Sequence, residues 1–353
     1  MVDWTRGDLY HTVSVLMVDP NDLATVRGEL QGVTGGKIDL QYYGDTRMGA
    51  ELTTRGAHGW DGSAALRIMH TVSDYTGILL TEPLFTGFVT AQSYDGEGDE
   101  LAVSWTLRSG LYALEAARSE LPYSVAKGSK ALGIVRSVCS ALGRPFSIGP
   151  DAHEYVYGTN KVFEAGKTYL SILLDVCSSA NNRLSVDANG GITVDGYVVP
   201  STRAADYEAY ENGARGTVIG PIKGDATGLD APARVIVRSE SGDKSVTGIA
   251  TVAAGSPSSA SVRGFRNDRF ETSTDLSPFT VGAAQALAQR YLSEDLSDVP
   301  TIKHGLLYRP LREGAIERLT LHDGTAARWM VSGGSLDLEK WTWELDLKGG
   351  WTA

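Results

Sequence analysis

Both ends of this sequence alternate apolar and polar residues, whereas the middle does not. Stretches such as YHTVSVLMV (10–18), KIDLQYY (37–43) and AALRIMHTV (64–72) alternate near the start, and four comparable stretches fill residues 301–350. A period of two is typical of strands with one buried face. The 41 glycines among 353 residues exceed the average share of about 7%, as expected where many turns join short strands. The sequence therefore predicts two β-rich blocks of similar size, each a sandwich or small barrel.

The middle of the chain has helical periodicity instead. GSKALGIVRSVCSALG (128–143) places six apolar residues on one helical stripe, with Ser129 as the expected N-cap and Gly143 as the expected stop. GKTYLSILLDVCSSANNRLSVDANGGITVDGYVVP (166–200) predicts a second helix followed by a hairpin that turns at Asn189-Gly190. Helix and hairpin together indicate a compact α+β insert between the two β-rich blocks.

These patterns predict a mainly β protein of the α+β class with three parts. A first β domain is expected over residues 1–122, an α+β linking domain over 123–205 and a second β domain over 206–353. The second domain includes one more helical pattern, at 277–296. Strands within 206–232 are the least certain to belong to it, because a polar, glycine-dotted segment could return to the first domain.

Composition limits the compartment and the partners. The formal charge is −11, with acidic and basic residues interspersed, which argues against a basic face that grips nucleic acid. No apolar run approaches the roughly 20 residues of a membrane-spanning helix, and the first residues do not resemble a signal peptide. Cys139 and Cys177 are the only cysteines, and both fall on apolar faces of expected helices. We therefore expect buried thiols, no disulfide and folding in a reducing cytoplasm.

No common catalytic or cofactor motif is present. The sequence lacks a G-x-S-x-G elbow, a P-loop, an H-E-x-x-H pair and a dinucleotide fingerprint. The six histidines show no metal-ligand spacing with each other or with cysteine, so each is expected to be an ordinary surface or hydrogen-bonded residue. They are His11, His58, His70, His153, His304 and His322.

Three weaker patterns leave alternatives open. Asp187, Asn189 and Asp195 faintly resemble a calcium loop, but a hairpin turn explains the same residues. Trp341 and Trp343 are expected on one face of a strand, as a sugar-stacking platform or, more simply, as barrel core or subunit contact. Two acid pairs match either glycosidase carboxylates or solvated turns; they are Glu97 with Asp99 and Glu294 with Asp295.

The order of the segments resembles the tail hub proteins of long-tailed bacteriophages. GGKIDLQYYGDTRMGAELTT (35–54) is similar to an early hairpin of that family, and LFTGFVTA (84–91) is similar to one of its strands. The helix and hairpin of 166–200 give the most specific match. Two C-terminal stretches resemble the last strands, glycine-arginine segment and alanine-rich helix of the family, although Ala315 follows Gly314 where many relatives have aspartate.

The resemblance implies an architecture and a role. Two tail-tube-type β-barrels, joined by the linking domain, would form a homotrimeric ring that adapts a sixfold tail tube to a threefold tail tip. The ring would form part of the DNA ejection channel without binding DNA specifically. Implied partners are the distal tail, tape measure and tail tip or receptor-binding proteins. The implied place is the virion tail tip, after assembly in the host bacterial cytoplasm and without a membrane anchor.

The predicted site residues follow from that role. No catalytic, cofactor-binding or metal-binding residue is expected, and the chain is not expected to be an enzyme. The acidic turn residues Asp95, Glu97 and Asp99 are expected to line the channel, where negative charge would keep passing DNA from adhering. The alternatives are a related tail or secretion-tube component, and a cell-wall-directed carbohydrate-binding or hydrolytic tail component.

Overall fold

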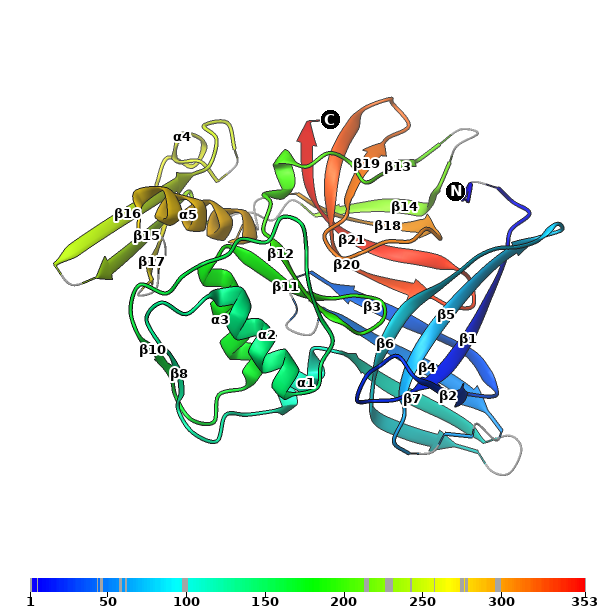
Figure 1. Cartoon of the computed structure of the whole chain (residues 1–353). Coiled ribbons are helices and arrows are strands. Elements are labelled where there is room, and N and C mark those ends of the chain that lie inside the picture. Colours follow the sequence, from blue (N-terminus) through cyan, green and yellow to red (C-terminus); the bar gives the residue numbers. More distant parts are fainter. Residues whose placement is uncertain are drawn as a thin grey trace.

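The computed structural model of the chain describes most of its residues (Figure 1). The described ranges are 2–4, 6–42, 44, 47–56, 59–60, 62–96, 101–212, 216–225, 231–241, 243–256, 258–273, 276, 279–295 and 300–352.

One large sheet carries both β-rich ends of the chain. It has 13 strands, and its main path runs β14-β18-β21-β20-β3-β4-β7-β6-β5-β1-β2. The first block consists of β1 (Tyr10–Val18), β2 (Val26–Glu29), β3 (Val33–Gln41), β4 (Met48–Arg55), β5 (Ala65–Asp74), β6 (Gly77–Asp95) and β7 (Ala102–Ser109). The second block consists of β13 (Tyr207–Tyr210), β14 (Val218–Asp225), β18 (Thr301–Leu307), β19 (Ile316–Thr320), β20 (Ala326–Asp337) and β21 (Thr342–Thr352).

The two blocks are joined through one long strand. The first half of β20 pairs with β19, and its second half pairs antiparallel with β3, in a register that places Ser335 opposite Asp39. A single buried cluster includes side chains of both blocks, such as Trp105 from the first and Trp343 from the second. The mainly β, α+β class is thus confirmed. Among the described strands no closed barrel is found, so the two-barrel part of the prediction is not confirmed.

The middle of the chain forms a small unit with its own core. Its elements are α1 (Tyr112–Ala116), β8 (Tyr123–Val125), α2 (Ala131–Ala141), β9 (Phe146–Ile148), β10 (Lys161–Phe163), α3 (Tyr169–Ser179), β11 (Asn182–Val186), β12 (Ile192–Gly196) and the 3-10 turn η2 (Pro200–Thr202). The apolar stripes of α2 and α3 are buried together, including Cys139 and Cys177, and burial raises the pKa of the two thiols to about 11 and about 12. We call this part the linking unit.

Both helices of the linking unit lie where the sequence predicts them, but one cap differs. Thr168 caps α3, because its hydroxyl accepts the backbone N–H of Ser171. The N-cap of α2 is Lys130 rather than Ser129, and it makes no side-chain capping bond. Glu154 instead accepts the free N–H of Leu132. A carboxylate distant in sequence therefore performs the role that the pattern assigned to a neighbouring serine.

Residues 234–295 contain a separate α/β unit within the range expected as the second β domain. It consists of β15 (Arg234–Ser241), β16 (Lys244–Thr251), α4 (Ala260–Arg263), β17 (Asp268–Ser273) and α5 (Val281–Asp295). The sheet order is β16-β15-β17, and α5 covers one face around its own buried cluster. A Cβ on Gly248 would lie 2.1 Å from the backbone of Ala284, so glycine permits this close contact. In Figure 1 this satellite unit stands apart from the large sheet.

The uncertain segment 206–232 contributes two strands, and both pair within the second block. β13 pairs with β19 and β14 pairs with β18. Neither returns to the first block among the described residues.

Candidate functional site

The hairpin β11–β12 lies where the first block, the second block and the satellite unit meet the linking unit. Its turn is built as the Asn-Gly signature predicts. The Asp187 carboxylate accepts the backbone N–H groups of Asn189 and Gly191, and Gly190 has a φ of +82°. Because the turn is rigid, the hairpin can place each of its ends against a different neighbour. We therefore consider it the candidate functional site, here called the central hairpin.

The turn of the central hairpin docks onto the first block. The Thr86 hydroxyl of β6 donates to the carbonyl of Ala188 at 2.8 Å. Arg67 of β5 donates to Thr86 at 3.0 Å and also to the carbonyl of Leu23. Gly190 packs so closely on Leu23 that a Cβ there would lie 2.9 Å from its methyl group. The contact is therefore a fixed one.

Arg183, in the first strand of the central hairpin, holds the second block. Its guanidinium lies 3.3 Å from Glu313, and the two side chains are only 18% and 7% exposed. The same guanidinium lies 3.9 Å from the ring centroid of Tyr42. Arg47 donates to the carbonyl of Leu184, and burial, together with the positive charge of Arg183, lowers the pKa of Arg47 to about 10. A buried ion pair and a cation–π contact thus fix the hairpin to both blocks.

The open end of the central hairpin holds the satellite unit. Arg290 of α5, which is buried, donates to the carbonyl of Asn182 at 3.0 Å and lies 4.9 Å from the ring centroid of Tyr197. The Tyr197 hydroxyl also bonds to Ser293. The first block, the second block and the satellite unit are therefore all attached to one hairpin, whose two strands have five residues each.

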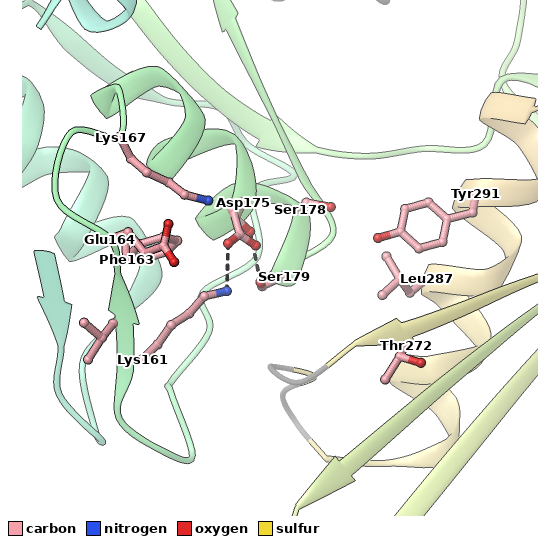
Figure 2. Close-up of a pocket in the computed structure, with 11 residues that line it drawn as sticks. Lys161, Phe163, Glu164, Lys167, Asp175, Ser178, Ser179, Thr272, Leu287 and Tyr291 are labelled. Carbon is pink, nitrogen blue, oxygen red and sulfur yellow. Dashed lines mark hydrogen bonds and ion pairs between the residues drawn. The ribbon is translucent and has the colours of Figure 1, made fainter. Parts of the chain in front are cut away.

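Two cavities lie beside these contacts. One, of about 950 Å³, is lined by both blocks and by the central hairpin, with Arg183, Glu82 and Tyr308 among its walls. The other, of about 440 Å³, separates the linking unit from the satellite unit (Figure 2). Figure 2 shows Lys161 paired with Asp175 on one wall and Tyr291 on the other. Both cavities therefore mark boundaries between units.

Replacing Gly190 with alanine is expected to lower the free energy of unfolding by about 1–2 kcal/mol from the left-handed backbone alone, and by more because the new Cβ meets Leu23. Gly128 is the matched control. Its φ is +88° and nothing lies within 4 Å of a Cβ there, so Gly128→Ala should lose only the unfolding free energy that the left-handed backbone costs. Urea unfolding of both variants measures the difference, and equal losses would contradict a tight docking contact.

The acidic residues singled out in the sequence do not form a common site. Asp95 is exposed at the end of β6, whereas Glu97 and Asp99 lie outside the described residues. Asp195 accepts the backbone N–H groups of Asp151 and Gly196, as Asp187 does within its own turn. In the described part of the chain no group of three or more His, Cys, Asp or Glu could hold a metal ion. The side chains of Glu294 and Asp295 are likewise outside the description.

Two tryptophans expected on one strand face have different positions. Trp343 is in β21 and buried, and its indole N–H donates to the carbonyl of Arg309. Trp341 precedes the strand in a turn with a φ of +55°, so only Trp343 lies in the strand. The prediction that the two share one strand is wrong, because the turn ends just before the strand begins. Both side chains pack on the core that the two blocks share.

The histidines are less scattered than their spacing indicates. The rings of His11 and His70 are nearly coplanar and hydrogen-bond to each other, and His304 forms a buried pair with Glu317. His322 is exposed and bonds to Glu211. His58 lies outside the described residues. The His11–His70 and His322–Glu211 contacts join residues far apart in sequence, so only the pairing of distant strands could have revealed them.

Solved structures share this fold along its whole length. The tail protein from Neisseria meningitidis MC58 aligns with a TM-score of 0.71 at 13% identity, over 97% of this chain and 98% of that chain. The 43 kDa tail protein of prophage MuSo2 from Shewanella oneidensis aligns with a TM-score of 0.63 at 10% identity, over 95% and 97%. Prophage tail protein gp18 from Listeria monocytogenes EGD-e aligns with a TM-score of 0.59 at 9% identity, over 97% and 95%.

A further match is to a chain of the Francisella PdpA-VgrG complex, with a TM-score of 0.54 at 9% identity, over 97% of this chain and 58% of that chain. No protein-family profile matches the sequence, and no curated protein matches it. The chain therefore has the fold of phage tail proteins, and the resemblance predicted from the sequence is confirmed at the level of fold. In the described part no helix is long and apolar enough to cross a membrane.

Proposed function

We propose that this chain is a structural tail protein of the hub type, in which three copies form a ring around the path of the viral DNA. The observation that carries the proposal is the end-to-end fold match to a tail protein, over 97% of this chain and 98% of that chain. A structural role also agrees with the large sheet, in which β14, β2 and, on a side branch, β13 have no second strand partner in the described part of the chain. Free edges favour association with further strands unless they are protected.

In this proposal the ring adapts the sixfold tail tube to a threefold tip and forms part of the DNA ejection channel. Its neighbours would be the distal tail, tape measure and tail tip or receptor-binding proteins. Exposed Asp95 is the described member of the acidic set proposed to line the channel. Mass measurement in solution and electron microscopy of particles test the ring: three copies around a central hole support it, and a monomer at high concentration that is absent from particles contradicts it.

We assign one subunit contact to the tip of the β5–β6 hairpin. Tyr75, Ile78 and Tyr10 are 85%, 72% and 65% exposed, and Ser73 pairs with both Tyr10 and Ile78 across the strands. Figure 1 shows this hairpin extending beyond the rest of the sheet. Exposed apolar clusters that include tyrosine are typical of contact surfaces. A tip of this kind would insert against a neighbouring subunit.

The double substitution Tyr75→Ser/Ile78→Ser is expected to weaken trimer formation at least tenfold, since the loss of even one anchor of this type costs about 1.4 kcal/mol or more. Its melting temperature as a monomer should change little, because both side chains are exposed. Tyr94→Ser, at the other end of β6 and 61% exposed, is the control. Sedimentation at several concentrations gives the association constants. Unchanged association would show that the tip is not part of the subunit interface, and it would not contradict the proposed ring.

The match to a chain of the PdpA-VgrG complex supports a second candidate, a component of a related secretion tube. The two roles differ in location. Antibody labelling of phage particles would favour the first, and its absence together with recovery in a VgrG-containing assembly would favour the second.

A further inference from the structure

A partly buried polar cluster lies between the two blocks, on strands that are not neighbours of the β3–β20 junction in the sheet order. The rings of His11 of β1 and His70 of β5 are parallel within 1° and lie edge to edge, with His11 Nδ1 2.9 Å from His70 Nε2. His70 is fully buried. Its other ring nitrogen lies 3.6 Å from Glu82 of β6, which also accepts the Tyr308 hydroxyl at 3.1 Å. The cluster therefore links the first block to a residue of the second.

Aromatic rings surround the two histidines. Trp341 stacks on both, at 5.1 Å from His11 and 4.2 Å from His70 between ring centroids. Tyr308 meets both edge-on, and Trp4 closes another side. Tyr308 and Trp341 are tied together because the Tyr308 N–H donates to the carbonyl of Trp341. This pair, here called the aromatic corner, is the part of the second block that rests on the histidines.

The hydrogen bond between the imidazoles requires one of the two rings to be neutral. One of the two facing nitrogens must be unprotonated to accept the N–H of the other. If both carried protons, two N–H groups would face each other at 2.9 Å, and two positive charges would share a space with little water. Protonation of both facing nitrogens, which would leave both rings positively charged, is therefore incompatible with the observed contact.

We propose that the His11–His70 pair is an acid-sensitive latch between the two blocks. When both imidazole rings become positively charged, the contact breaks and the aromatic corner is released, while the β3–β20 pairing remains as the hinge. The cavity of about 950 Å³ reaches Glu82, Tyr308 and Trp4, so water has access to the rim of the latch. This inference is independent of the proposed tail role, because it concerns one chain in solution.

The groups that face the pair set the pH range. Burial, followed by the charge of His70, lowers the pKa of His11 to about 4. The pKa of Glu82 is lowered by His70, whose Nδ1 lies 3.6 Å away, and by the Tyr308 hydroxyl, and the positive charge of Arg312 lowers it further. The walls formed by Trp4 and Trp341 are uncharged. Since the pKa of His11 is below its ordinary 6.5 when the latch is closed, closure is favoured above that value and loses stability as the pH falls from about 6.5 through about 4.

Spin labels on the two blocks can measure the opening. Glu29 on β2 and Lys303 on β18 are exposed and suit Glu29→Cys and Lys303→Cys, whereas Cys139 and Cys177 are buried and should remain unlabelled. We expect the distance distribution at about pH 7.5 to lengthen or broaden at about pH 4.5. Hydrogen exchange should show that β3 and β20 stay protected while the strand ends around His11 and Trp341 lose protection.

His11→Gln is the decisive variant, because an amide oxygen can still accept from His70 but cannot be protonated in this range. It should keep the closed distances at both pH values. His322→Gln, at an exposed histidine, should open like the parent protein. The proposal is overturned if the parent distances do not change, if His11→Gln opens equally, or if β3 and β20 lose protection together with the latch, which would indicate global unfolding. Should His11→Gln fold poorly, His11→Phe is the second variant: it leaves His70 without its acceptor and is less stable at both pH values, but it cannot be protonated, so its distances should not change between them.

Discussion

Glu317→Ala is expected to lower the free energy of unfolding by about 3–5 kcal/mol, because it leaves a buried charge without its partner. Glu317 and His304 are both fully buried, and His304 Nε2 lies 2.8 Å from the carboxylate. The other carboxylate oxygen accepts the Tyr207 hydroxyl at 2.7 Å. One carboxylate thus holds three strands, since His304 lies on β18, Tyr207 on β13 and Glu317 on β19.

The protonation state of His304 follows from its surroundings. Its second ring nitrogen lies 3.0 Å from the carbonyl of Gly305, so both nitrogens face oxygen acceptors, and the charged ring satisfies both. Burial lowers the pKa of His304, but the hydrogen bond and negative charge of Glu317 outweigh it, and the pKa is raised above 6.5. The contribution of this pair to the free energy of unfolding is fully present below about pH 6.5 and is lost as the pH rises through the raised pKa of His304.

Urea unfolding at about pH 6 and about pH 9 distinguishes this pair from simple packing. The parent protein should lose stability from this pair toward the higher pH, and Glu317→Ala should lack that component. Glu208→Ala is the control, because Glu208 pairs with Arg318 at a half-exposed site and should cost about 1 kcal/mol or less. A loss of similar size in both variants would contradict the role assigned to the buried pair.

Local patterns predicted local structure well. The helices at 131–141 and 169–179 and the turn at Asn189-Gly190 depend on residues within a few positions of each other, and the structure has all three. The alternation at both chain ends predicted strands for the same reason. Periodicity reports which face of an element is buried, and it contains no information about the element that covers that face.

Long-range pairing explains what the sequence did not reveal. The β3–β20 register joins residues about 300 positions apart, so two blocks that read as separate domains share a core. Parallel pairing of β15 with β17 places the strands of the satellite unit in a sheet of their own, although the helix of this unit was expected within the second β domain. His11 and His70 meet only because β1 pairs with β5 in a register that places His70 opposite Val13.

In the candidate site, too, the local structure could be predicted and the long-range contacts could not. Asp187, Asn189 and Gly190 build the turn of the central hairpin as the sequence predicts, and the hairpin itself gave the most specific family resemblance. Its partners could not be predicted, because Arg183, Thr86 and Arg290 are ordinary polar residues in their own strands or helix. The channel-lining role of Asp95, Glu97 and Asp99 depends on an assembly of several chains and stays a prediction.

Leu336→Pro is expected to uncouple the two blocks, which makes it the most direct test of the shared sheet. Leu336 of β20 lies opposite Ile38 of β3, and two residues further along the Leu338 N–H donates to the carbonyl of Gly36. Because hydrogen-bonded pairs recur at every second residue of an antiparallel ladder, the N–H of Leu336 also points to β3. Proline removes that N–H and clashes with the neighbouring strand, at a cost on the order of 3 kcal/mol or more. Leu336→Ala is the control at the same position, because it also loses the leucine side chain but keeps the backbone N–H.

The two substitutions should differ in cooperativity as well as in stability. Because one buried cluster includes side chains of both blocks, calorimetry of the parent protein and of Leu336→Ala should show a single transition for the two blocks. In Leu336→Pro the junction is broken, and hydrogen exchange should separate β4–β7 from β18–β21 into units with different opening free energies. If Leu336→Pro lowers the melting temperature but both blocks still open together, the shared core rather than the strand pairing holds them as one unit.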